Sequence, residues 1–122
     1  MKKIMILMII SLLLCGCGEN KNLKSTNKTM SCSGMRKLLD EDDKAMLIDV
    51  RTKEEYAEGH LEGAVNIEYR ELIDKLKDVD KNTNIIVYCK TGNRSDLSYN
   101  ELKNSGFVNV YDLGSIKNCQ ET

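Results

Sequence analysis

The sequence predicts a single α/β domain built on a parallel sheet with helices on both faces. Strand-like apolar runs alternate with helix-like stretches through the chain, and the most apolar run of the domain, "NIIVYC" at 84–89, is typical of a strand buried on both sides. Strands that alternate with helices pair in parallel through right-handed crossovers. The chain has 122 residues, of which 41% are hydrophobic, enough for one compact core.

The first half of this domain predicts a helix, a strand and a second helix. A helix is expected over 34–40, because apolar residues recur at helical spacing after two serines that are suited to cap it. The strand "AMLIDV" at 45–50 follows. The capping-box sequence "TKEE" at 52–55 then starts a short helix, which Gly59 can end.

The second half continues the alternation. "AVNI" at 64–67 is the next expected strand, apolar spacing indicates a helix around 72–76, and a further helix after the central strand ends at Gly106. "FVNVYDL" at 107–113 supplies the last strand. Chemistry in open parallel sheets collects at the carboxyl ends of the strands, and Cys89 stands at such an end.

The first residues indicate a secretion signal. "MKK" followed by the apolar run 4–15 has the basic start and short apolar stretch of a signal peptide, too short to span a bilayer. "LCGC" at 14–17 resembles a bacterial lipobox, in which Cys17 receives lipid; an ordinary signal peptide with incidental cysteines is the alternative. We expect a membrane partner through this lipid and an extracytoplasmic location, on the outer face of the cell membrane or in the periplasm. The chain then divides into a signal peptide (1–16), a lipidated polar tether (17–28) and a folded domain (29–122).

Charge and residue content argue against several classes of function. Removal of the predicted signal peptide takes away Lys2 and Lys3 and leaves 16 basic and 19 acidic side chains, a formal charge of −3. This charge offers no electrostatic basis for binding nucleic acid. The one histidine, His60, and the lack of a CxxC motif in the domain give a metal site no support. We expect neither a metal nor a cofactor.

The stretch "YCKTGNRS" at 88–95 places a cysteine where a strand turns into a helix. Backbone N–H groups of such a turn, together with the helix N-terminus, form a positive concavity suited to an anion. With the cations Lys90 and Arg94 nearby, these groups favour a thiolate at Cys89. We expect a reactive nucleophile; the alternative is a buried strand-end cysteine that only fills the core.

Three stretches taken together resemble the single-domain rhodanese family of sulfurtransferases: "LIDVRTKEEYAEGHLEGAVNI", "IIVYCKTGNRS" and "GFVNVYDLGSI". They follow in the family's order and cover about 30–116. The resemblance implies a three-layer fold with a central five-stranded parallel sheet and helices on both faces. It also implies a persulfide on Cys89, small sulfur-containing anions as donors, and a thiol or protein as sulfur acceptor.

Three departures from the family pattern concern the surface and the C-terminus. Glu62 replaces a proline that is usual in a turn, which is expected to cost little. Ser115 and Cys119 stand where a glycine and a tryptophan are common, and the terminal helix is therefore expected to be short. These departures affect the cover over one edge of the core and leave the cysteine loop intact.

The resemblance assigns roles to the site residues. Cys89 would take the outer sulfur of thiosulfate, release sulfite and pass the sulfur to an acceptor. Arg94 either clamps the loop to a carboxylate or binds the substrate anion, Arg51 either forms a salt bridge or reaches the pocket, and Asp49 supports them. His60 belongs to a turn and is not expected to act as a base. Backbone N–H groups would stabilise the persulfide along the loop of Lys90, Thr91, Gly92, Asn93, Arg94 and Ser95.

Two rival functions stay open. A phosphatase or arsenate reductase on the same fold would need a roomier loop than the four residues "KTGN" between Cys89 and Arg94. A lipid-anchored binding module would keep the fold without turnover. Finally, the first and last strands are neighbours in the resembling fold, which implies that Cys32 and Cys119 approach and pair in a disulfide, leaving Cys89 free.

Overall fold

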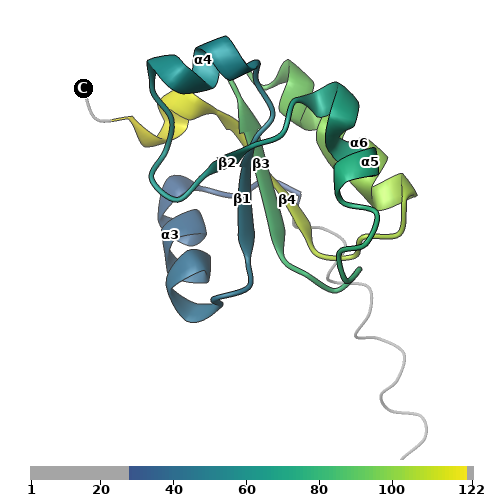
Figure 1. Ribbon diagram of the computed structural model, residues 1–122. Coiled ribbons are helices and arrows are strands. Elements are labelled where there is room, and N and C mark those ends of the chain that lie inside the picture. Colours follow the sequence, from purple (N-terminus) through teal and green to yellow (C-terminus); the bar gives the residue numbers. More distant parts are fainter. Residues whose placement is uncertain (1–27, 121–122) are drawn as a thin grey trace, which may run out of the picture.

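The computed structural model describes residues 28–120, which form one parallel sheet with helices on both faces (Figure 1). The strand order is β2-β1-β3-β4, and every pairing is parallel. The strands are β1 (Met46–Asp49), β2 (Val65–Asn66), β3 (Ile85–Cys89) and β4 (Val110–Ser115). The helices are α3 (Cys32–Glu41), α4 (Lys53–Glu58), α5 (Leu72–Lys75) and α6 (Asn93–Asn104), with 3₁₀ turns η1 (Tyr69–Glu71) and η2 (Ile116–Cys119).

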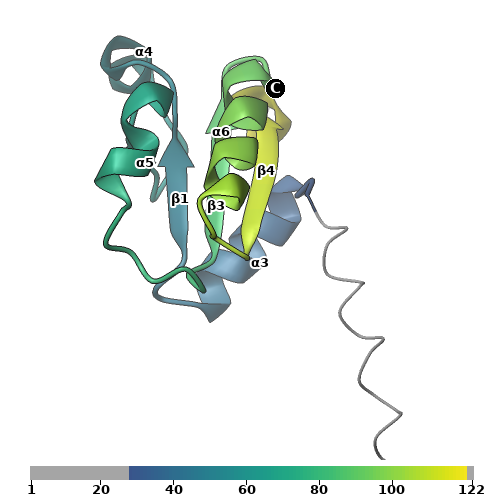
Figure 2. The same cartoon turned by 90° about the vertical axis from the view of Figure 1, so that its right-hand side faces the viewer.

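The sheet separates two apolar clusters, as the alternation of side chains along β3 shows. Ile85, Val87 and Cys89 belong to the cluster under α5 and α6, whereas Ile86 and Tyr88 belong to the cluster that includes residues of α3 and η2. Figure 2 looks onto α5 and α6, with α3 behind the sheet. All five residues of β3 are buried, which confirms the expectation of a strand covered on both faces.

The predicted α/β class and parallel pairing are confirmed, while the sheet is smaller than the resemblance implied. Four strands are present within residues 28–120, and the segment before α3 adds one isolated bridge, Thr29 to Asp112. The Asp112 N–H donates to the Lys28 carbonyl and the Met30 N–H donates to the Asp112 carbonyl. Ser31 then already caps α3, so the described segment between Lys28 and this helix is too short to form a fifth strand.

Helix boundaries follow the predicted caps. The Ser31 hydroxyl accepts the Gly34 N–H at 3.0 Å, so α3 begins at Cys32, two residues earlier than predicted. At α4 the full capping box is present: Thr52 accepts the Glu55 N–H, and the Glu55 carboxylate accepts the Thr52 N–H. The two residues at the ends of this short box therefore fix where α4 starts.

Several predicted elements are shorter than expected, and β1 and β2 each lose one residue at either end. The helix predicted around 72–76 is entered through the 3₁₀ turn η1 and amounts to one turn, although Leu72 and Leu76 are buried as its spacing required. The last strand begins at Val110 instead of at residue 107. The Phe107 N–H bonds back to the Leu102 carbonyl and closes α6, so the chain cannot enter the sheet until three residues later.

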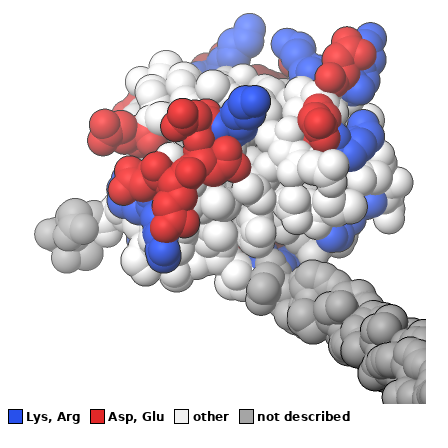
Figure 3. Space-filling view, turned by 90° about the horizontal axis from the view of Figure 1, so that it is seen from below, with Lys and Arg blue, Asp and Glu red and all other residues white. Residues whose placement is uncertain are grey.

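The surface at the amino ends of the strands carries both signs of charge. Acidic side chains gather there over the end of α3, where the sequence runs Asp40–Asp43, with basic side chains beside them (Figure 3). Such a mixed face lacks the uniform positive charge by which a protein surface attracts nucleic acid. None of the helices described between residues 28 and 120 has the length and apolar character of a membrane span. The signal peptide, Cys17 and the tether lie outside the described residues.

Candidate active site

Cys89 is the last residue of β3 and is fully buried at the carboxyl end of the sheet. Its Sγ accepts two backbone N–H groups, from Gly92 at 3.0 Å and from Ser95 at 3.3 Å. Both donors lie at the start of α6, the end of a helix that carries partial positive charge. The loop therefore holds the sulfur between fixed dipoles that favour negative charge on it.

The conformation of the loop depends on Gly92. Its φ of 105° lies in the left-handed region that side-chain-bearing residues rarely adopt, so another residue here would strain the turn even though a Cβ would meet no neighbour. The Ser95 hydroxyl donates to the Gly92 carbonyl at 3.2 Å, and Ser95 is fully buried. Thr91 and Asn93 are exposed, and their contribution to the loop is confined to the backbone turn.

A contact from β4 secures the other side of the loop. The Ser115 hydroxyl donates to the Lys90 carbonyl at 2.6 Å, and Ser115 pairs with Cys89 across the sheet. Ser115 is one of the residues that depart from the family pattern, and this contact could not be foreseen from the sequence. The Lys90 side chain itself is exposed.

Arg94 is held by a carboxylate, which was one of its two predicted roles. Its guanidinium makes a forked pair with Glu55, at 2.8 and 3.1 Å. The hydrogen bond from Arg94, aided by the Thr52 N–H and opposed by partial burial, lowers the pKa of Glu55 to about 2. The pair joins the loop at the head of α6 to the first turn of α4. The sequence predicted that Glu55 belongs to the capping box, but it did not predict that Glu55 pairs with Arg94.

Asp49 and Arg51 form a buried ion pair at the end of β1. The Arg51 Nη2 to Asp49 Oδ2 distance is 2.7 Å, and the same nitrogen donates to the Gly59 carbonyl at 2.6 Å. The Tyr88 hydroxyl donates to Asp49 at 2.8 Å and accepts the Leu61 N–H at 3.0 Å. Burial raises the pKa of Tyr88 well above its ordinary value, so it serves as a neutral hydrogen-bond bridge. Arg51 thus takes the predicted salt-bridge role, and Tyr88 is a supporting residue that the sequence analysis missed.

A cavity of about 190 Å³ opens at this end of the sheet. Val50, which belongs to the same apolar cluster as Cys89, lines it. The other lining residues come from the segments that follow β1 and β2, from η1 and from α6: Arg51, Thr52, Glu68, Tyr69, Arg70 and Arg94. The cavity and the buried sulfur therefore share one end and one face of the sheet.

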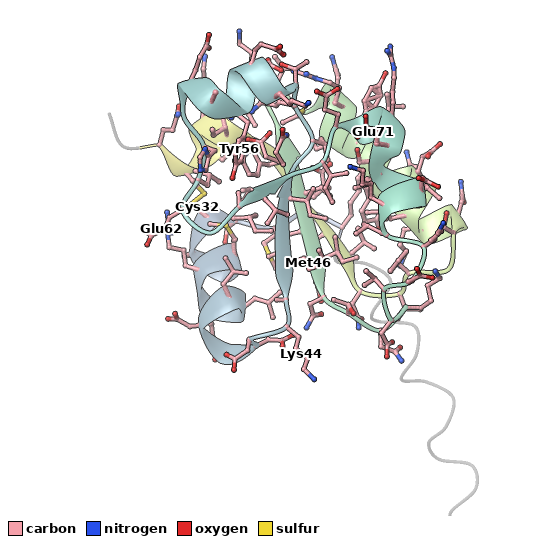
Figure 4. All side chains as sticks on the ribbon, viewed as in Figure 1. Cys32, Lys44, Met46, Tyr56, Glu62 and Glu71 are labelled. Atoms are coloured by element: carbon pink, nitrogen blue, oxygen red, sulfur yellow. A yellow bond between two sulfur atoms is a disulfide. The ribbon has the colours of Figure 1, made fainter. Side chains whose placement is uncertain are left out.

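The remaining cysteines and the histidine lie apart from this sulfur. Cys32 and Cys119 are bonded to each other with their Cα atoms 5.2 Å apart, and the bridge ties the start of α3 to η2 (Figure 4). Cys89 is the free cysteine of the described residues. The His60 ring is stacked on Tyr56, 3.7 Å between centroids, and its Nδ1 lies 2.9 Å from the Tyr56 carbonyl. Within residues 28–120 no group of three or more His, Cys, Asp or Glu side chains is arranged to hold a metal.

A parallel sheet with a strand-end cysteine, whose sulfur receives backbone N–H groups from a helix start, defines an α/β protein with a thiol-based anion site. The chain belongs to the rhodanese-like domain family, which it matches over residues 32–122. The family includes single-domain sulfurtransferases among the relatives of this chain.

Thiosulfate sulfurtransferase PspE of Escherichia coli is 35% identical over 72 residues, which cover 57% of this chain and 69% of that protein. A rhodanese-like domain protein of Staphylococcus aureus superposes with a TM-score of 0.62 at 26% identity, over 72% of this chain and 85% of that one. Human single-domain sulfurtransferase TSTD1 shares the fold, with a TM-score of 0.69 at 24% identity over 77% of this chain and 97% of that one. Other relatives are much longer: the aligned part makes up 45% of YrkF of Bacillus subtilis and 26% of the yeast adenylyltransferase and sulfurtransferase UBA4.

Proposed function

We propose that the protein is an extracytoplasmic sulfurtransferase that moves sulfane sulfur from thiosulfate or a similar donor to a thiophilic acceptor through a persulfide on Cys89. The observation that carries the proposal is the pair of backbone N–H groups, from Gly92 and Ser95, that point at the Cys89 sulfur. They favour negative charge on a sulfur that is also the free thiol of the described residues.

The reaction proceeds in two transfers. The Cys89 thiolate attacks the outer sulfur of thiosulfate, the sulfur–sulfur bond of the donor breaks, and sulfite leaves with the bonding electron pair. The charge is conserved, because one thiolate and one thiosulfate dianion become one persulfide anion and one sulfite dianion. The acceptor, a thiolate, cyanide or a protein thiol, then attacks the outer sulfur of the persulfide and regenerates the Cys89 thiolate.

The clamp on Arg94 favours sulfur transfer over the rival phosphatase chemistry. An oxyanion-transferring loop needs its arginine free to bind the tetrahedral group, whereas both arms of Arg94 are occupied by Glu55. The loop also encloses only four residues between Cys89 and Arg94. A persulfide adds a single sulfur atom, which suits this smaller loop.

Mass spectrometry of the Cys89 peptide after treatment with thiosulfate tests the chemistry. We expect a gain of one sulfur atom on Cys89, the release of one sulfite per chain, and loss of the added sulfur on addition of a thiol. Cys89→Ser removes the sulfite burst with little change of fold, because a hydroxyl of similar size cannot carry the persulfide. Equal thiosulfate consumption by this variant and its parent contradicts the proposal, and a folded parent without a burst favours the binding module.

The location is tested separately. We propose that lipid on Cys17 anchors the chain, because the polar tether at 17–28 offers no apolar anchor of its own. Cys17→Ala is expected to release the protein from the membrane fraction or to stop its maturation. Membrane retention of a chain that carries no lipid contradicts this part of the proposal.

A further inference from the structure

The cavity at the carboxyl end of the sheet contains three arginines, and only one of them is free to bind a ligand. Arg51 is paired with Asp49, and Arg94 is paired with Glu55. Arg70 has no carboxylate within 4 Å among residues 28–120 and is exposed to solvent. It therefore brings the one arginine charge of the cavity that a neighbouring acid does not neutralise.

Two further polar residues of the cavity, Glu68 and Thr52, are engaged by neighbouring groups of the chain. Glu68 accepts the Lys53 N–H at 3.0 Å, at the first residue of α4. The Thr52 hydroxyl donates to Glu55 at 3.2 Å. The Arg70 guanidinium rests 5.4 Å from the centroid of the Tyr69 ring, a cation–π contact that holds the side chain without using its N–H donors in an ion pair. An incoming anion thus meets unpaired donors at Arg70.

Arg70 also lines a second cavity of about 260 Å³, between η1 and α6. Tyr69 lines both cavities as well, so the side chains of Arg70 and Tyr69 lie between the two cavities. Lys90, one of the two cations that the sequence places near Cys89, is not among the residues lining either cavity. Its loop faces Ser115 of β4, on the other side of Cys89.

We propose that Arg70 is the residue that binds the oxyanion end of the sulfur donor, and that it selects donors that carry a sulfonate-type group. The inference rests on the proposed function and adds to it a specificity residue. A guanidinium presents two parallel donors to two oxygens of such a group, and the cavity places this group beside the apolar cluster that contains Cys89. In this arrangement the outer sulfur of the donor faces the apolar cluster to which Cys89 belongs.

Steady-state kinetics of the full chain separate this role from a structural one. In a two-step transfer, kcat/KM for each substrate reports only its own half of the cycle. Arg70→Gln is expected to lower kcat/KM for thiosulfate at least about ten-fold, the loss of one charged hydrogen-bonding contact, and to leave kcat/KM for the acceptor unchanged. Arg70→Lys restores part of the loss, since it keeps the charge and loses the fork. Arg36→Gln, an exposed arginine on α3 across the sheet, is the matched control.

A binding measurement keeps the inference testable without turnover. Thiosulfate is titrated calorimetrically into the full-length Cys89→Ser chain, with and without Arg70→Gln, and the second substitution is expected to weaken binding at least about ten-fold. Weakened binding together with a parent that releases no sulfite supports Arg70 as the anion site and overturns sulfur transfer. Unchanged binding, or an equal fall of kcat/KM for donor and acceptor, overturns the role of Arg70 whatever the parent does.

Discussion

Replacing Glu55 by glutamine is expected to destabilise the domain in a pH-dependent way. Glutamine can still accept the Thr52 N–H and keep the capping box of α4, so the change removes mainly the charge that faces Arg94. Glu54 lies beside it in the first turn of the same helix. Glu54→Gln therefore removes one acidic charge from the same place and is the matched control.

The magnitude follows from the pKa of Glu55, which falls from 4.5 to about 2. Each pKa unit corresponds to about 1.4 kcal/mol, so the interactions of the carboxylate contribute at most about 3.5 kcal/mol. Water screens part of this, because the side chains of Arg94 and Glu55 are 28% and 25% exposed. A loss of about 2 kcal/mol in the free energy of unfolding at pH 7 is expected for Glu55→Gln.

The sign of the pH dependence is fixed by the lowered pKa. The contribution of Glu55 is complete well above its ordinary pKa of 4.5 and is lost as the pH falls toward about 2. Urea unfolding of the parent and both variants at pH 7, 5 and 3 measures it: the parent exceeds Glu55→Gln by a similar margin at the two higher values and by less at pH 3. A margin below about 0.5 kcal/mol at pH 7, or one that does not shrink at pH 3, refutes the reasoning.

Three further outcomes are expected. Arg94→Lys lowers turnover more than Lys90→Ala, because a point charge cannot reproduce the forked clamp, and equal or reversed losses in a sulfite assay argue against the clamp. Replacing Cys32 and Cys119 by serine lowers the free energy of unfolding by about 4 to 5 kcal/mol, the loop entropy of a bridge that spans 87 residues, and a thermal melt without a large downward shift contradicts it. Tyr88→Phe costs about 1 to 3 kcal/mol, because it leaves buried partners unsatisfied at both ends of the lost hydroxyl; chemical denaturation that matches the parent excludes this.

The parts of the fold that depend on local pattern could be predicted from the sequence. The alternation of strands and helices, the capping box at Thr52 and the position of Cys89 at a strand end all follow from short-range spacing. The late start of β4 could not be foreseen, because it depends on how Phe107 closes α6. The short segment at Thr29 likewise reflects a competition between strand pairing and the helix that follows.

The candidate site divides in the same way. Cys89 and its loop are contiguous in the sequence, so their proximity needed no tertiary information. The partner of Arg94, Glu55, lies 39 residues away in the sequence. The sequence around the other arginines of the cavity likewise does not reveal which of them has a carboxylate partner. Sequence reasoning could name the cations near the sulfur, but it could not say that Arg51 and Arg94 are neutralised while Arg70 is free.

The pairing of Cys32 with Cys119 limits the ways in which a sulfur atom bound to Cys89 can leave the domain. Within residues 28–120 it leaves Cys89 without a second thiol to which a bound sulfur could be relayed or which could expel it as an internal disulfide. Under the proposed function, each domain therefore carries one sulfur atom at a time and keeps it until another molecule arrives to collect it. The lifetime of the persulfide is then set by the concentration of the acceptor and by its access to Cys89, and the domain stores one sulfur atom between the donor reaction and the acceptor reaction.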